Sequence, residues 1–220
     1  MARRSLYIFD FDGLLVDTER VYRAGWRATF DRVGLDMPDA ELEEWVGKSI
    51  DDTRAVVTER FGDPGLFDRL YAIREEYVYD VIDRGGVEAK PYALEALEAV
   101  HRAGVPVCIV SSSWRRRVMA IIERLGAAGL VDYLVCAEDV DRRKPSPDPY
   151  LKALGHFGCP AGEAVAFEDS LTGRSAALAA GVGVWLVPDT SSRPFEIPEG
   201  AWHADDLSIV LRVLAQGEEG

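Results

Sequence analysis

The feature that most constrains the fold is a series of five short apolar runs with helix-like segments between the later ones. None of the runs alternates strictly between apolar and polar residues, which predicts strands of a parallel sheet that is covered on both faces. Apolar residues between the runs recur at a spacing of three, as at Leu94, Leu97 and Val100, which is typical of helices. The order predicts a doubly wound α/β sheet. The runs are Leu6–Phe9, Val105–Val110, Tyr133–Ala137, Ala164–Phe167 and Val182–Val187.

One interval breaks the alternation of strands and helices. Residues 19–83 contain helix-like segments and no convincing strand, and they are rich in aromatic residues such as Trp26 and Phe30. We expect a small helical bundle with an aromatic core. Because it follows the first strand, such a bundle could also act as a lid over the end of that strand. Residues 1–18 and 84–220 would then form the α/β core.

Composition bounds the function classes. The chain has 220 residues, 48% of them hydrophobic, and a formal net charge of -13. This predicts a sizeable core, and it argues against a broad nucleic-acid or anionic-membrane surface, since phosphate backbones are held by cationic side chains. The chain has three widely spaced cysteines, and it has neither a secretory leader pattern nor a long apolar run. We expect a cytoplasmic protein, monomeric or a small homo-oligomer, whose partner is a small molecule.

Polar residues follow the apolar runs at the points where ligands bind in open α/β sheets, the C-terminal ends of the strands. An Asp-x-Asp pair alone is weak evidence, and Asp139–Asp141 is interpreted as a solvated turn. Asp10 and Asp12 differ because they come directly after a buried run and lie on the same side of the extended chain. The residues that follow the runs are Asp10, Asp12, Ser111, Ser112, Glu168 and Asp169, and Lys144 lies in the segment after the third run.

This set of residue types suits phosphoryl chemistry. A carboxylate can attack phosphorus and form an aspartyl-phosphate, and a second carboxylic acid can protonate the leaving oxygen. Carboxylates crowded together at neutral pH call for a divalent cation, and oxygen ligands without histidine or cysteine suit Mg²⁺. A lysine and a hydroxyl remain for the other phosphate oxygens. Backbone N–H groups near Ser111 and Ser112 could cradle an anion at a helix start.

With these motifs in order, the chain resembles the haloacid dehalogenase superfamily, close to its β-phosphoglucomutase and phosphoglycolate phosphatase branch. The resemblance implies a Rossmann-like core with a helical cap. It makes Asp10 the nucleophile and Asp12 the general acid and then base, with Ser111 and Lys144 on the transferring phosphoryl. Asp10, the Asp12 carbonyl and Asp169 would hold Mg²⁺, with Glu168 a direct or an indirect ligand. The matching segments are Asp10–Glu19, the strand ending at Ser111, Lys144–Asp148 and Phe167–Ser170.

The chain also departs from the pattern of the mutases it resembles. Tyr22 stands where they carry a histidine. They also carry a cap arginine three residues after a glycine, whereas here Gly47 is followed by Lys48, Ser49 and Ile50. Arg143 precedes the motif lysine in place of the usual glycine or serine. Lys48 and Trp114 are candidates for substrate selection, and Arg143 either faces solvent or adds a charge at the mouth of the site.

Three functions follow from these observations. The first is an Mg²⁺-dependent phosphatase of a small phosphomonoester, such as a sugar phosphate or phosphoglycolate. The second is a phosphosugar mutase, against which Tyr22 and the missing cap arginine argue. The third is a phospho-accepting receiver domain, which the helical insertion and the single Asp-x-Asp motif disfavour. A dinucleotide oxidoreductase is excluded because no glycine-rich turn follows the first run.

Overall fold

The chain folds into two compact units. The structure is a computed structural model that describes residues 4–45, 50–189 and 196–218. The described parts of Met1–Asp17, Glu88–Asp189 and Pro194–Gly220 form an α/β core unit, and those of Thr18–Val87 form a helical unit. In the described part of the chain, every helix is too short or too polar to cross a membrane.

A six-stranded parallel sheet forms the centre of the core unit, in the order β3-β2-β1-β4-β5-β6. The doubly wound parallel sheet expected from the sequence is therefore confirmed. The sixth strand was not predicted, because it is two residues long and exposed and so leaves no apolar run. The strands are β1 (Leu6–Phe9), β2 (Val107–Val110), β3 (Tyr133–Val135), β4 (Ala164–Glu168), β5 (Gly183–Leu186) and β6 (Trp202–His203).

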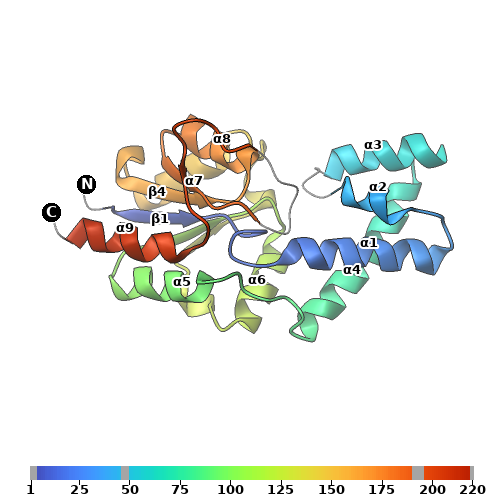
Figure 1. Ribbon diagram of the computed structural model, residues 1–220, viewed down its shortest axis with the longest axis horizontal. Helices are drawn as coiled ribbons and strands as arrows, with labels where there is room; N and C mark the ends of the chain where they lie inside the picture. The colour runs from blue at the N-terminus through green and yellow to red at the C-terminus, as the bar shows by residue number, and fades with distance from the viewer. Residues whose placement is uncertain (1–3, 46–49, 190–195, 219–220) are drawn as a thin grey trace. The chain divides into compact units, whose positions relative to one another are not determined.

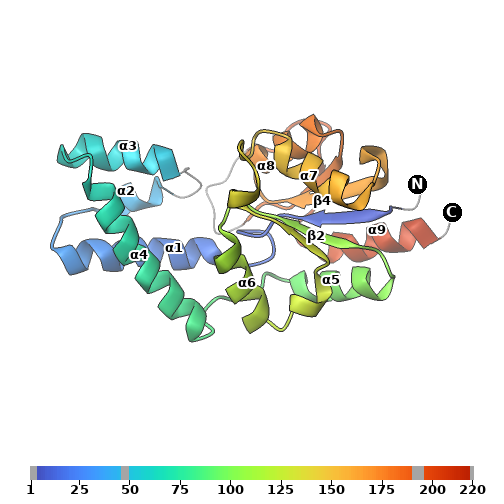
Figure 2. The ribbon, with the colours of Figure 1, turned by 180° about the vertical axis from the view of Figure 1, so that it is seen from behind.

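Helices cover both faces of the sheet: α7 and α8 lie on one face, and α5, α6 and α9 lie on the other (Figures 1 and 2). Alternate residues of β1 serve the two faces, as strand geometry requires. Leu6 and Ile8 join the core cluster that includes residues of α7 and α8, whereas the ring of Phe9 stacks on Phe167 at 5.1 Å. The helices are α5 (Ala93–Arg102), α6 (Arg115–Arg124), α7 (Asp148–Phe157), α8 (Leu171–Ala179) and α9 (Ser208–Glu218).

Four helices make up the described part of the helical unit: α1 (Thr18–Val33), α2 (Asp39–Glu43), α3 (Ile50–Phe61) and α4 (Leu66–Asp83). Aromatic rings fill its core. Phe30 is fully buried and lies against Trp26 and Trp45 with ring centroids 6.2 and 5.8 Å apart. Aromatic rings bury large apolar areas, and this burial stabilises the small helical unit. That this unit serves as a cap over residues of the core unit stays a prediction.

The topology of the sheet singles out the C-terminal end of β1. β1 lies between β2 and β4. After β1 the chain adds β2 and β3 on one side, and it then crosses over to add β4, β5 and β6 on the other side. Ligands in open α/β sheets bind at such a switch point. Phe9 pairs in register with Ile109 of β2 and with Phe167 of β4, which brings the residues after these three strands to one level.

Candidate functional site

Asp10 and Asp12 leave β1 in a tight loop. Asp10 is buried, and its backbone N–H donates to the carbonyl of Phe167 at 2.9 Å, which continues the pairing of β1 with β4. The chain then turns through Gly13, whose φ is 86°. A Cβ at this position would overlap the carboxylate of Asp169. Glycine is therefore required twice here, for its conformation and for the close approach of a carboxylate.

Ser111 follows β2, and its hydroxyl joins this loop. Ser111 Oγ donates to Asp12 Oδ2 at 3.1 Å and accepts from the backbone N–H of Ser113 at 2.9 Å. Trp114, which precedes α6, makes no side-chain capping hydrogen bond there. Ser112 and Trp114, the other two residues proposed near this loop, have exposed side chains. Of these residues, Ser111 is the one that the structure joins directly to an aspartate.

Lys144 connects two of the carboxylates. Its Nζ donates to Asp10 Oδ1 at 2.5 Å, to Glu168 Oε1 at 2.6 Å and to the carbonyl of Val110 at 2.8 Å. The Lys144 side chain is only 5% exposed, and the peptide bond to Pro145 is cis. All three protons of the ammonium therefore have acceptors at the ends of three different strands. These hydrogen bonds are shorter than the one between Ser111 and Asp12.

Glu168 and Asp169 complete an acidic cluster. Asp10, Glu168 and Asp169 each offer a carboxylate oxygen, and these oxygens lie within 4.8 Å of one another. Glu168 Oε1 also accepts from the buried hydroxyl of Tyr150. A Cβ on Gly173 would overlap the Glu168 carboxylate, so α8 can begin next to Glu168 only with glycine at this position.

Burial and crowding set the charges of this cluster. Burial and, to a smaller extent, the negative charge of Glu168 raise the pKa of Asp10 to about 8, against the opposing attraction of Lys144. Burial also raises the pKa of Asp169 well above its usual value, together with the charges of Asp10 and Glu168. For Lys144, burial lowers the pKa, but the attraction of Asp10 and Glu168 outweighs it and the pKa is raised overall. One ammonium thus faces an excess of carboxylates, which a bound cation would relieve.

The donor set fits a hard divalent cation. Glu168 Oε2 is buried and accepts no hydrogen bond from the residues that the structure describes, although a buried carboxylate oxygen normally has a partner. The candidate ligands are carboxylate oxygens, which Mg²⁺ prefers, and neither imidazole nor thiolate accompanies them. Asp10, Asp169 and Glu168 could therefore hold the ion. The carbonyl of Asp12 as a further ligand stays a prediction.

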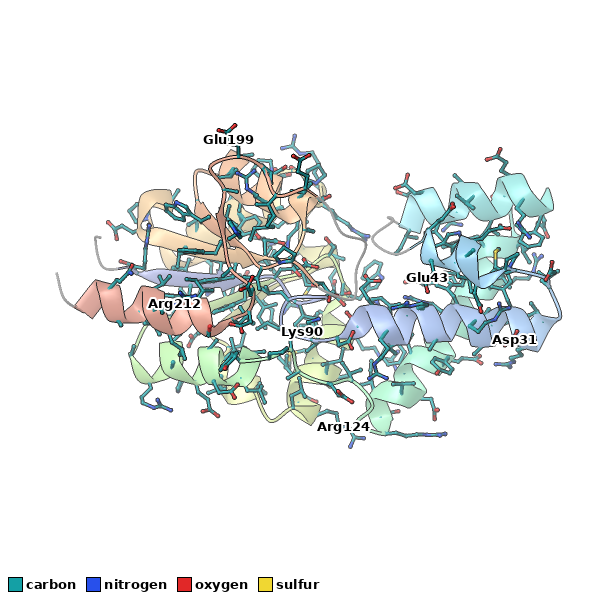
Figure 3. The ribbon with its side chains drawn as sticks, viewed as in Figure 1. Asp31, Glu43, Lys90, Arg124, Glu199 and Arg212 are labelled. Carbon is teal, nitrogen blue, oxygen red and sulfur yellow. The ribbon has the colours of Figure 1, made fainter. Side chains whose placement is uncertain are left out.

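Two features near the site were missed by the sequence analysis. Tyr150 binds Glu168 from 18 residues away, and no local pattern indicates that pairing. Lys90 Nζ forms an ion pair with the fully buried side chain of Asp189 at 2.6 Å. Lys90 lies where the chain returns to the core unit (Figure 3), and Asp189 lies against Gly13. The rarity of lysine, with four in the chain, was the one signal that pointed to Lys90.

The helical unit has a pocket of its own. Among the residues that line it are Tyr22, Trp26, Trp45 and Arg74. The guanidinium of Arg74 lies 4.2 Å from the centre of the Tyr22 ring, and its side chain is buried among the aromatic residues. Lys48, the other residue proposed for substrate selection in this unit, lies outside the described residues.

Comparison with known proteins adds independent findings. The family model described as "Haloacid dehalogenase-like hydrolase" matches residues 7–187. Protein CbbY of Rhodobacter capsulatus is 31% identical over 91% of this chain and 92% of its own. Validoxylamine A 7'-phosphate phosphatase of Streptomyces hygroscopicus is 31% identical over 80% and 81%. Beta-phosphoglucomutase of Mycobacterium bovis is 27% identical over 92% and 87%. The crystal structure of CbbY from Rhodobacter sphaeroides in complex with phosphate has a TM-score of 0.82, with 26% identity over 96% of this chain and 99% of that one.

Proposed function

Because the chain belongs to the haloacid dehalogenase-like hydrolase family, as the order of its motifs indicated, we propose that it is an Mg²⁺-dependent phosphatase of small phosphomonoesters that works through an aspartyl-phosphate. A phosphatase is the activity in the name of a relative that matches most of the chain. The observation that carries the proposal is the contact of Lys144 with Asp10 at the switch point of the sheet. It places a cation beside a carboxylate at the point where a phosphoryl group would bind.

Each step of the proposed reaction uses a residue of this network. A carboxylate oxygen of Asp10 attacks phosphorus, and the bond from phosphorus to the ester oxygen breaks while Asp12 gives that oxygen a proton. Water then attacks the phosphorus of the aspartyl-phosphate, Asp12 takes a proton from it, and Asp10 leaves as a carboxylate. Ser111 Oγ and Lys144 Nζ lie next to the two aspartates and would hold the transferring oxygens.

Asp12 is suited to the proton-transfer role by its position. It is partly exposed, unlike the buried Asp10, so a leaving group or a water molecule can reach it. Its hydrogen bond with Ser111 fixes one carboxylate oxygen. The bound Mg²⁺ would supply charge neutralisation between the acidic cluster and a phosphate oxygen. Asp10, Asp169 and Glu168 would hold it.

The test is release of inorganic phosphate from a panel of phosphorylated metabolites with Mg²⁺ present. We expect activity that EDTA abolishes and that Asp10→Asn lowers by at least about 10³-fold, since the nucleophile is lost. Asp141→Asn is the matched control, because Asp141 belongs to the other Asp-x-Asp pair and is exposed. Full activity of Asp10→Asn would show that the assigned nucleophile is wrong.

The mutase remains the second candidate, because a beta-phosphoglucomutase is among the relatives. Tyr22 argues against it here. The Tyr22 ring packs against the buried Arg74 of its own unit. A tyrosine hydroxyl cannot replace a histidine imidazole, which gains and loses a proton near neutral pH. The products formed from β-glucose 1-phosphate distinguish the phosphatase from the mutase. Inorganic phosphate alone supports the phosphatase, and glucose 6-phosphate would support the mutase.

A further inference from the structure

An exposed arginine and an exposed tryptophan meet at the rim of the candidate site. Arg143 immediately precedes Lys144, and Trp114 follows Ser111 by three residues. The guanidinium carbon of Arg143 lies 5.4 Å from the centre of the Trp114 ring, and Trp114 is 43% exposed. The contact therefore joins the two loops that carry the proposed phosphoryl-binding residues, and both loops belong to the core unit.

Arg143 differs from neighbouring arginines in having no carboxylate partner among the described residues. Arg142 donates to both carboxylate oxygens of Asp148 at 2.8 Å, and Arg115 pairs with Asp139 at 2.5 Å. Within residues 4–45, 50–189 and 196–218, no carboxylate forms an ion pair with Arg143. An uncompensated cation in a chain of net charge -13 makes a local site for an anion.

The aromatic ring gives this cation an orientation. A guanidinium that lies over an indole is held by the cation–π attraction, and its planar N–H donors stay available at the edges of the group. This arrangement suits bidentate recognition of a phosphate or a carboxylate. An unsupported surface arginine would lose more conformational entropy when it binds the same anion.

We propose that Arg143, positioned by Trp114, is a subsite for a second anionic group on the substrate. The inference rests on the proposed function and narrows its substrate class to phosphomonoesters whose leaving group carries another phosphate or a carboxylate. The subsite lies close along the chain to the proposed phosphoryl-binding residues. Arg143 is one residue from Lys144 and Trp114 is three from Ser111, so their Cα atoms lie within about 11 Å of the phosphoryl-binding residues.

The experiment compares three groups of esters: sugar bisphosphates, phosphorylated carboxylic acids, and monophosphates that lack the second anion. For the wild type we expect the highest kcat/KM in one of the first two groups, and which group it is identifies the second anion. Arg143→Gln should lower kcat/KM for that group about 10–100-fold, the range of a charge-assisted hydrogen bond. The same variant should leave the third group within about twofold. Trp114→Ala should show a smaller loss with the same selectivity.

Arg142→Gln is the matched control. It removes an adjacent exposed arginine that already has a carboxylate partner, so it should change none of the three groups. Equal losses on all esters in Arg143→Gln, or no loss at all, would overturn the subsite. So would a wild type that prefers esters without a second anion.

Binding to the Asp10→Asn variant separates this inference from the proposed function. Calorimetric titration with the sugar bisphosphate or phosphorylated carboxylic acid that the wild type hydrolyses fastest, or with fructose 1,6-bisphosphate if it hydrolyses none, measures affinity without turnover. We expect the double variant Asp10→Asn, Arg143→Gln to bind about 10–100-fold more weakly than Asp10→Asn alone. Equal affinity would refute the subsite. Absence of phosphate release by the wild type would refute the phosphatase, and the titration would still decide the subsite.

Discussion

Replacing Lys144 with methionine would leave two buried carboxylates without the cation between them. Lys144 Nζ lies 2.5 Å from Asp10 and 2.6 Å from Glu168, and its side chain is 5% exposed. Removing one partner of a buried ion pair costs about 3–5 kcal/mol, because the remaining charge stays away from water. We expect Lys144→Met to lower the free energy of unfolding of the metal-free protein by about this amount near pH 9. The melting temperature should fall by roughly 6–20 °C.

The measurement is thermal and urea denaturation in EDTA, followed by circular dichroism. Lys152→Met is the matched control, because Lys152 is exposed and donates to a backbone carbonyl; it should stay within about 0.5 kcal/mol of the wild type. The cost of Lys144→Met should shrink near pH 5, where Asp10, whose pKa is raised to about 8, is protonated. A loss below about 1 kcal/mol, or the same loss at both pH values, would refute the assigned charges.

Three further outcomes are expected. Gly13→Ala and Gly34→Ala both force alanine into a positive φ, at about 1 kcal/mol or more each. Only Gly13→Ala should also weaken Mg²⁺ binding in calorimetry, since its Cβ overlaps the Asp169 carboxylate and nothing lies near a Cβ at Gly34; equal Mg²⁺ affinities would contradict this. Phe30→Ala should cost about 3–5 kcal/mol in denaturation of the helical unit, and a loss below about 1 kcal/mol would not fit its burial. The metal-free protein should lose stability as pH rises from about 4 to about 8, because the folded state binds the Asp10 proton more tightly than the unfolded chain. Asp10→Asn should make that slope shallower and leave the part due to Asp169, whose pKa is also raised by burial, and an unchanged slope would assign the effect to groups other than Asp10.

Much of the core unit could be predicted from the sequence because its signals are local. Each predicted strand is an apolar run that can be buried on both faces, and each helix repeats its apolar residues every three or four positions. β6 escaped prediction because Trp202–His203 is too short to form a pattern. The helix start expected just after Ser111 and Ser112 is found at Arg115, because the polar run before it ends the strand.

The candidate site could be predicted only in part. Residue types and their places after strands indicated Asp10, Asp12, Ser111, Lys144, Glu168 and Asp169, and the family resemblance gave them roles. No pattern in the sequence joins Glu168 to Tyr150, or Lys90 to Asp189, because those pairs are 18 and 99 residues apart. Such contacts depend on how the strands are ordered in the sheet.

The sequence by itself determined which residues would become strands and helices and which polar side chains would follow them, because those properties depend on neighbours a few residues away. Only the tertiary structure decided which carboxylates share Lys144, that one Glu168 oxygen has no hydrogen-bond partner among the described residues, and that Arg143 contacts Trp114. These outcomes follow from the placement of β1 between β2 and β4. That order is fixed by packing across the whole core unit, and it brings together groups that are far apart in the chain, such as Asp10 and Lys144, which are 134 residues apart.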